Sequence, residues 1–199
     1  MGVRPSKDLA YGADGLGRCP WATSTVDYVT YHDDEWGRPV HGDTDIFERL
    51  TLEAFQSGLS WITILRKRES FRAAFANFEP DAVAAFDVTD RERLLADVGI
   101  VRNRAKIDAT ITNARALLAL QDQHGVGALD ALFWSHAPAP KPLPSALTQV
   151  PASTPESVAL AKALKGQGFV FVGPTTMYAA MQAMGVVNDH LVGCIAVRA

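Results

Sequence analysis

Two cysteines in the chain each have a histidine at a spacing that would let the pair bind one metal ion. Twelve residues separate Cys19 from His32. Three residues separate His190 from Cys194, so that pair would share one face of a helix. Two thiolates and two imidazoles form a tetrahedral ligand set for Zn²⁺. If all four bind, no coordination position remains for water, so the zinc would be structural and would clamp the N-terminal segment to the C-terminal one. The alternative is that both thiols are small buried hydrophobic groups and both imidazoles are ordinary core or surface groups.

Aromatic side chains gather near a carboxylate in the first third of the chain. Five of them lie within about forty residues: Trp21, Tyr28, Tyr31, Trp36 and Trp61. Glu53 follows Ile46 by seven residues and Leu50 by three, at the edge of the apolar stripe of one predicted helix. A carboxylate there is either buried with a partner or held in a pocket. For any one ring core packing is the ordinary interpretation, but aromatic faces with a carboxylate also suit a flat, cationic or polar ligand.

A glycine-centred turn between two predicted helices carries three cations. Residues 94–107 predict a helix, a turn at Gly99 and a second helix that opens with Arg102, Arg104 and Lys106. Backbone N–H groups at such a turn and at the start of the second helix can bind one phosphate, and the cations can bind its neighbours. This contact would position DNA without reading its sequence. Helix–glycine–helix corners also occur with no ligand.

The charge of the chain is unevenly distributed. The net charge of -3 taken alone counts against a nucleic-acid partner. Residues 27–54, however, carry a local charge of -6, whereas residues 61–78 and 102–165 carry +3 each. Solvated helix faces are the ordinary explanation of such clusters. The alternative is that the two basic regions hold phosphates.

The elements that must position these residues are predicted to be helices. Ile107, Ile111, Ala114 and Leu118 put one apolar stripe on a helix from about Arg104 to Gln121. Further helix starts are predicted at 43–45, 79–80, 90 and 153–156, and helix ends at Gly58, Gly99, Gly125 and Gly185. Residues 136–155 hold six of the eleven prolines and predict one irregular connection. The strand-like run 169–172 has no partner strand, which favours a buried loop or a helix entry. The predicted fold class is all-α, in a single helical domain.

Length and composition indicate a soluble globular protein. With 199 residues, 48% of them hydrophobic and 21% charged, the chain fits one domain with a core. We expect a flexible N-terminal tail at residues 1–18 and one domain at 19–199. No apolar run is long enough for a membrane span, and residues 1–18 lack the apolar region of a secretory signal. Two cysteines do not make a disulfide framework, so we expect a reduced, cytoplasmic protein.

Taken in order, these residues resemble the 3-methyladenine DNA glycosylase I family. The similarity covers about residue 18 to the C-terminus. The motifs that carry it are Tyr31-His32-Asp33-Asp34-Glu35-Trp36-Gly37, Leu52-Glu53, Gln56-Ser57-Gly58-Leu59-Ser60-Trp61, Lys67-Arg68-Glu69, the Gly99 turn, residues 169–173, and Asn188-Asp189-His190 with Cys194. Jointly these motifs are very specific. The segment before Arg18 is longer than in close relatives, and Ala54-Phe55 stands where some relatives have smaller or more polar residues.

The resemblance implies a helix-hairpin-helix glycosylase fold with a structural Zn²⁺ and a place in base excision repair. Cys19, His32, His190 and Cys194 match the zinc ligands. Glu53 matches the catalytic carboxylate of the base pocket, Tyr31 and Trp61 match residues that would sandwich the base, and Trp21 and Trp36 would line or support it. The residues expected to contact DNA are Gln56, Gly58, Leu59, Gly99, Arg102, Arg104 and Lys106. Leu59 could instead belong to the core.

The implied activity is that of a monofunctional N-glycosyl hydrolase, expected to act as a monomer on double-stranded DNA. Methylation at N3 leaves adenine cationic, so the base is already a good leaving group. The enzyme would flip the base out, hold it and excise it, leaving an abasic site. The family lacks the catalytic Asp typical of helix-hairpin-helix glycosylases, which agrees with this division of labour. Two alternatives are a zinc hydrolase with a catalytic metal and a non-catalytic reader of alkylated DNA.

Overall fold

The apolar stripe predicted on the longest helix is buried in the computed structural model, which describes residues 4–197. Helix α6 spans Arg104–His124, and its residues Ile107, Ile111 and Ala114 are buried. The Asn103 side chain caps it by accepting a hydrogen bond from the Lys106 N–H. It extends three residues beyond Gln121, to His124, and stops at Gly125 as predicted, where a φ of +88° suits a glycine.

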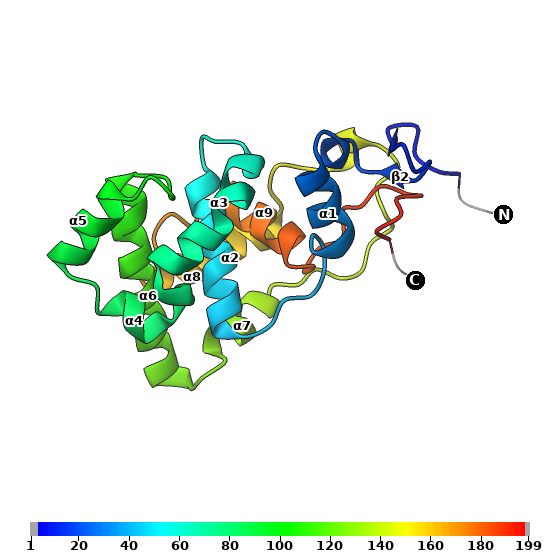
Figure 1. The fold of residues 1–199 in the computed structure, drawn as a ribbon. Coiled ribbons are helices and arrows are strands. Elements are labelled where there is room, and N and C mark those ends of the chain that lie inside the picture. The colour runs from blue at the N-terminus through cyan, green and yellow to red at the C-terminus, as the bar shows by residue number, and fades with distance from the viewer. Residues whose placement is uncertain (1–3, 198–199) are drawn as a thin grey trace.

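Within residues 4–197 the chain forms nine α-helices and one two-stranded antiparallel sheet (Figure 1). The strands are β1 (Ala10–Tyr11) and β2 (Gly17–Arg18). The other α-helices are α1 (Val26–Asp34), α2 (Asp43–Gln56), α3 (Trp61–Ala74), α4 (Pro80–Ala84), α5 (Val88–Ala96), α7 (Ala128–Trp134), α8 (Pro155–Gly166) and α9 (Pro174–Ala183). Short 3₁₀ helices cover Pro20–Thr23, Ala76–Phe78 and Leu147–Gln149. The prediction of a single helical domain is confirmed in the main, but the chain is not entirely α-helical, because β1 and β2 form a small sheet. None of the helices in the described part of the chain is long and apolar enough to cross a membrane.

One predicted helix start shifts, and a second helix starts where predicted but after a different N-cap residue. Helix α5 begins at Val88 because Asp87 is its N-cap, and Asp90 completes the capping box from inside the helix. Helix α2 begins at Asp43, after Gly42. The Asp43 carboxylate does not cap its own helix. It accepts hydrogen bonds from the backbone N–H groups of Gly127 and Asp130 at the start of α7.

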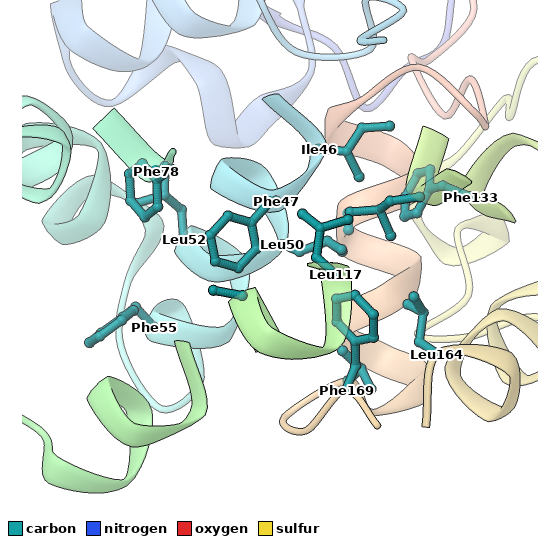
Figure 2. Close-up of a cluster of buried hydrophobic side chains, with 14 of the residues drawn as sticks. Ile46, Phe47, Leu50, Leu52, Phe55, Phe78, Leu117, Phe133, Leu164 and Phe169 are labelled. Atoms are coloured by element: carbon teal, nitrogen blue, oxygen red, sulfur yellow. The ribbon is translucent and has the colours of Figure 1, made fainter. Parts of the chain in front are cut away.

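The core is built around α2. Its residues Ile46, Phe47, Leu50, Leu52 and Phe55 are buried. Figure 2 shows these side chains among residues that come from other parts of the chain, namely Phe78, Leu117, Phe133, Leu164 and Phe169. Helix α2 packs against α3, α6, α7 and α9. A polar side chain on the core-facing side of this helix is therefore removed from water unless it faces a cavity.

Residues 4–18, which we expected to form a flexible tail, are instead built into the fold. Strands β1 and β2 pair with Ala10 opposite Arg18. Leu9 is buried against Cys19, Leu191 and Cys194. The hairpin and the C-terminal segment lie at the same end of the molecule (Figure 1). Long-range contacts thus order a segment whose local sequence is polar and glycine-rich. Residues 1–3 of the expected tail and 198–199 of the expected domain lie outside the described residues.

The two segments predicted to be irregular are irregular. Residues 135–154 connect α7 to α8 with only the short helix Leu147–Gln149. Residues 169–172 form no strand: Phe169 and Val172 are buried, while Val170 and Phe171 are partly exposed. The Asn113 side chain takes the place of a partner strand, because it donates to the Val170 carbonyl and accepts from the Val170 N–H. Phe171 turns the chain with a φ of +57°.

Candidate active site and metal centre

A pocket of about 380 Å³ lies where α1, α2, the start of α3 and α9 meet the irregular connection before α8. All five aromatic residues singled out in the sequence line it, together with Glu53 and Gln56. The full lining is Cys19, Trp21, Tyr28, Tyr31, Trp36, Glu53, Gln56, Ser60, Trp61, Leu147, Val150, Ala179, Gln182 and Asp189. The pocket therefore combines a largely aromatic wall with a few polar groups.

The aromatic rings of the pocket contact one another directly. Trp21 meets Tyr28 edge-on at 5.6 Å between ring centroids and Trp36 at 5.2 Å. Tyr31 and Trp61 are 5.4 Å apart with their planes inclined by 44°. This separation is that of two rings in contact. A flat ligand would have to stack on an outer face of this pair or part the two rings.

Glu53 is held on α2 inside the pocket and is only 6% exposed. Burial raises its pKa to about 8, and Arg49, one turn earlier, lowers it only in part. The guanidinium of Arg49 is 3.3 Å from a Glu35 carboxylate oxygen. Glu53 also helps to raise the pKa of the buried Tyr31 hydroxyl, after the larger effect of burial. Glu53 is therefore mostly protonated at neutral pH, and a cation placed beside it would stabilise its ionised form.

A second carboxylate in the pocket, Asp189, is held by three neighbouring side chains. Asp189 accepts hydrogen bonds from the Tyr178 hydroxyl and, at 2.8 Å, from the Gln182 amide. The Lys141 ammonium lies 2.9 Å from its other oxygen. Burial opposes ionisation of Asp189, but these hydrogen bonds outweigh it and lower the pKa of this carboxyl. Burial and the bond to Asp189 raise the pKa of Tyr178. The pocket thus contains one anionic carboxylate and one that is poised to ionise.

Sequence reasoning missed several lining residues. Gln182 is a lone amide on a helix that is otherwise mostly apolar, and this contrast could have indicated a polar group in a binding site. Asp189 was noticed only as part of a motif. Leu147 and Val150 come from the proline-rich connection, where no periodicity indicated a buried side. Their place in the pocket depends on long-range contacts.

The four predicted metal ligands meet in one buried cluster behind this pocket. Their ligand atoms all lie within 4.8 Å of one another. Cys19 Sγ is 3.9 Å from Cys194 Sγ and 3.8 Å from His190 Nδ1. Cys194 Sγ is 3.6 Å from His190 Nδ1 and 3.3 Å from His32 Nε2. The prediction that these residues converge is confirmed, and the cluster could hold a metal ion.

The other ring nitrogen of each histidine has a partner. His32 Nδ1 is 2.7 Å from an Asp33 oxygen, and Arg18 donates to both oxygens of Asp33. His190 Nε2 is 3.3 Å from the Trp36 carbonyl. Such partners fix the ring orientation and the tautomer of metal-binding histidines. A Cβ at Gly37 would lie 2.9 Å from His190 Nε2, which explains the glycine that closes the Tyr31–Gly37 motif.

Some of the predicted DNA-contacting residues are exposed, whereas others already make hydrogen bonds within the protein. Arg102 and Arg104 are exposed at the start of α6. Lys106, contrary to our expectation of a phosphate contact, is buried, because its ammonium donates to the carbonyls of Phe55 and Ser57 at 2.8 and 2.6 Å. The Gly99 N–H donates to Asp97, so it is also occupied.

The basic stretch in α3 is paired within the protein. Arg66 pairs with Asp27, Arg68 with Glu35 and Arg72 with Glu48. Lys67 donates to the carbonyls of Val98 and Gly99. Acids of segment 27–54 therefore neutralise the arginines of the basic segment 61–78, which leaves the start of α6 as the exposed basic surface among the predicted DNA contacts.

The turn between α2 and α3 projects beside the pocket. Gly58 has a φ of +81°, and Leu59 is 43% exposed. Its neighbours Gln56 and Ser60 line the pocket. Leu59 is therefore no core residue, which removes the alternative considered for it.

Comparison with known proteins gives consistent matches over most of the chain. Residues 21–198 match a family described as methyladenine glycosylase. The chain is 49% identical to DNA-3-methyladenine glycosylase 1 of Escherichia coli over 179 residues, which cover 89% of this chain and 95% of that protein. It is 45% identical to DNA-3-methyladenine glycosylase of Haemophilus influenzae, over 89% of this chain and 96% of that protein. A crystal structure of a 3-methyladenine DNA glycosylase I variant in complex with 3-methyladenine superposes with a TM-score of 0.85 at 32% identity, covering 92% of this chain and 98% of that one.

Proposed function

Because the chain belongs to the methyladenine glycosylase family, we propose that it excises 3-methyladenine from alkylated double-stranded DNA and leaves an abasic site. The observation that carries this proposal is the buried Glu53 carboxyl in a pocket walled by aromatic rings. The pocket suits a flat base, and the carboxyl distinguishes a cationic base from a neutral one.

The reaction requires little general acid–base catalysis from the protein. N3-methylation places a positive charge on the base. When the bond between the sugar C1′ and the base N9 breaks, its electron pair goes to the base, which leaves neutral. Water then forms the new bond to C1′ and loses a proton. Ordinary glycoside hydrolysis needs a general acid to assist departure, whereas here the lesion supplies that activation.

Glu53 provides selectivity for the cationic base. With a pKa of about 8 this carboxyl is mostly protonated at neutral pH. A cationic base beside it favours the ionised form, which then accepts a hydrogen bond from the adenine edge. Neutral adenine offers no charge to offset the desolvation of a carboxylate. Normal adenines are thus held less tightly than methylated ones.

The aromatic wall supplies stacking and a free donor. Tyr31 and Trp61 are in contact, so the base stacks on this pair or displaces one ring from the other. Trp61 Nε1 is buried without a hydrogen-bond partner in the described part of the chain, and an acceptor on the base satisfies it. A base reaches this pocket only after it leaves the helical stack, so the enzyme flips it out.

Two exposed features fit the handling of the duplex. Leu59, at the tip of the turn after α2, enters the gap that the flipped base leaves. Helices α5 and α6 with their Gly99 turn act as a helix-hairpin-helix element, in which Arg102 and Arg104 contact phosphates. Lys106 connects this element to α2, because its ammonium donates to the carbonyls at the end of that helix.

The four-residue cluster fits a structural Zn²⁺. Bond lengths of about 2.3 Å to sulfur and about 2.0 Å to nitrogen in a tetrahedron place two sulfurs about 3.8 Å apart and a sulfur and a nitrogen about 3.6 Å apart. Here the two sulfurs are 3.9 Å apart, three of the sulfur–nitrogen distances are 3.3, 3.6 and 3.8 Å, and all ligand atoms lie within 4.8 Å of one another. A bound zinc would supply a cross-link between Cys19 and the segment 190–194. Thiolates suited to this role persist in a reducing compartment such as the cytoplasm.

The test is single-turnover release of 3-methyladenine from a methylated duplex. Glu53→Gln removes the charge at nearly constant shape and is expected to slow release by about a hundredfold. Glu92→Gln, an exposed carboxyl on α5, is the matched control and keeps the wild-type rate. Both variants are checked for folding by thermal unfolding. Unchanged release by Glu53→Gln would remove Glu53 from the site, and a wild-type protein that binds the lesion without releasing a base would make this chain a reader.

A further inference from the structure

One wall of the base pocket comes from a segment that is held in part by residues far from it in the sequence. Leu147 and Val150 line the pocket from the irregular connection between α7 and α8. Leu147 is 44% exposed and begins a 3₁₀ helix of three residues, which has no side-chain cap from its own N-cap residue. Within the segment, the Gln149 side chain accepts hydrogen bonds from the Ser145 N–H and hydroxyl. The Leu147 N–H is not bound within the segment, and its partner comes from elsewhere in the chain.

The N-terminal segment supplies those contacts. The Asp8 carboxylate accepts a hydrogen bond from the Leu147 N–H at 2.9 Å. The Ser6 hydroxyl donates to the Ser145 carbonyl at 2.7 Å. Residues 6 and 8 thus bind residues 145 and 147 in register, across 139 positions of sequence.

This N-terminal segment is itself anchored. Ser6 is buried, its N–H donates to the Val192 carbonyl, and its hydroxyl accepts from the Asp8 N–H. The Val192 N–H in turn donates to the Pro144 carbonyl. A Cβ at Gly193 would lie 2.7 Å from Pro5 Cβ, so the N- and C-terminal segments are in close contact. Figure 1 shows the hairpin, the connection and the C-terminal segment together at one end of the molecule.

We propose that Asp8 and Ser6 are positioning residues that hold Leu147 against the base pocket and thereby restrict the size of the alkylated base that binds there. This inference rests on the proposed function of the pocket. Both residues precede residue 21, where the match to the family begins. The size limit would therefore be set in part by a segment outside the matched region.

The experiment compares binding of free 3-methyladenine and 3-ethyladenine to the full chain by quenching of tryptophan fluorescence, because Trp21, Trp36 and Trp61 line the pocket. Asp8→Ala removes the acceptor for the Leu147 N–H. Asp8→Asn keeps an acceptor oxygen, and Lys7→Ala alters the exposed residue between Ser6 and Asp8. The quantity measured is the ratio of the two dissociation constants within each variant, so a general loss of stability that weakens both bases alike does not move it.

We expect Asp8→Ala to shift this ratio at least threefold in favour of 3-ethyladenine, while Asp8→Asn and Lys7→Ala keep the wild-type ratio. Leu147→Ala should shift the ratio in the same direction. The double variant of Asp8 and Leu147 should shift it no further than Leu147→Ala alone, because both changes open the same wall.

An unchanged ratio in Asp8→Ala, an equal shift in Lys7→Ala, or full additivity in the double variant would overturn the proposal. Release of 3-methyladenine from methylated duplex by the wild type is measured in parallel. Its absence refutes the proposed function itself, whereas an active wild type with an unchanged ratio in Asp8→Ala refutes only the positioning role.

Discussion

Replacing Glu53 by Gln should stabilise the fold, and more so as the pH rises. Glu53 is 6% exposed and its pKa is raised by burial from 4.5 to about 8. Between these two values the unfolded chain gives up the Glu53 proton while the folded chain keeps it. The free energy of unfolding therefore falls as pH rises through this window and shows no further dependence on this group above pH 8.

The size of the effect follows from the shift. A difference of about 3.5 pKa units corresponds to about 5 kcal/mol at high pH, and about 3.5 kcal/mol of this accrues between pH 5 and pH 8. Total stabilities of single domains are about 5 to 15 kcal/mol, so the change is large enough to measure. Gln cannot ionise, so the Glu53→Gln variant does not lose this unfolding free energy as the pH rises.

The assay is urea unfolding followed by tryptophan fluorescence at pH 5, 6, 7 and 8, with zinc at constant concentration. The quantity of interest is the difference in unfolding free energy between Glu53→Gln and wild type at each pH, since the titration of the metal ligands cancels in that difference. Glu92→Gln serves as an exposed control. A difference that stays constant from pH 5 to pH 8 would show that Glu53 is not desolvated, and the argument for its selectivity would fail with it.

Three further changes test other parts of the molecule. Cys19→Ser should reduce bound zinc, measured by metal analysis, and lower the thermal unfolding temperature, because the cross-link to the C-terminal segment is lost. A variant that has lost its zinc but unfolds at the wild-type temperature would contradict a structural site. Arg104→Ala should weaken binding to damaged and undamaged duplex alike and reduce the salt dependence by about one unit of slope, whereas a lesion-selective loss would contradict a phosphate contact. Lys106→Met should lower the urea unfolding free energy by about 2 kcal/mol, because two carbonyls lose a charged donor; unchanged stability would show that this buried contact is dispensable.

Local sequence signals located most helices because caps and glycines act within a few residues. Thr154 caps α8 and Asn103 caps α6, because each side chain accepts a hydrogen bond from a backbone N–H in the first turn of its helix. The start of α5 was misplaced because Asp87 and Asp90 are both acids able to cap, and only the backbone shows which of them precedes the helix.

Features that depend on contacts between distant segments could not be predicted in this way. Arg18 is buried because its guanidinium bridges Asp14 and Asp33, and neither bond follows from the local composition that indicated a tail. The side chain of Lys106 looked like a phosphate ligand by type. Thr110 and Asn113, which follow it on the same side of α6, are also polar, so no sequence signal indicated that this side is buried.

The metal cluster and the base pocket share a wall, which couples the two proposals. Tyr31 and His32 are neighbours in α1, and one lines the pocket while the other belongs to the cluster. The Trp36 ring also lines the pocket and lies edge-on to His190, 4.6 Å between centroids. Cys19 belongs to both sites. An ion that fixes both imidazoles therefore fixes the rings packed on them, although it touches no substrate. Loss of the metal should then loosen base binding before it unfolds the core around α2, which has no residue in the cluster.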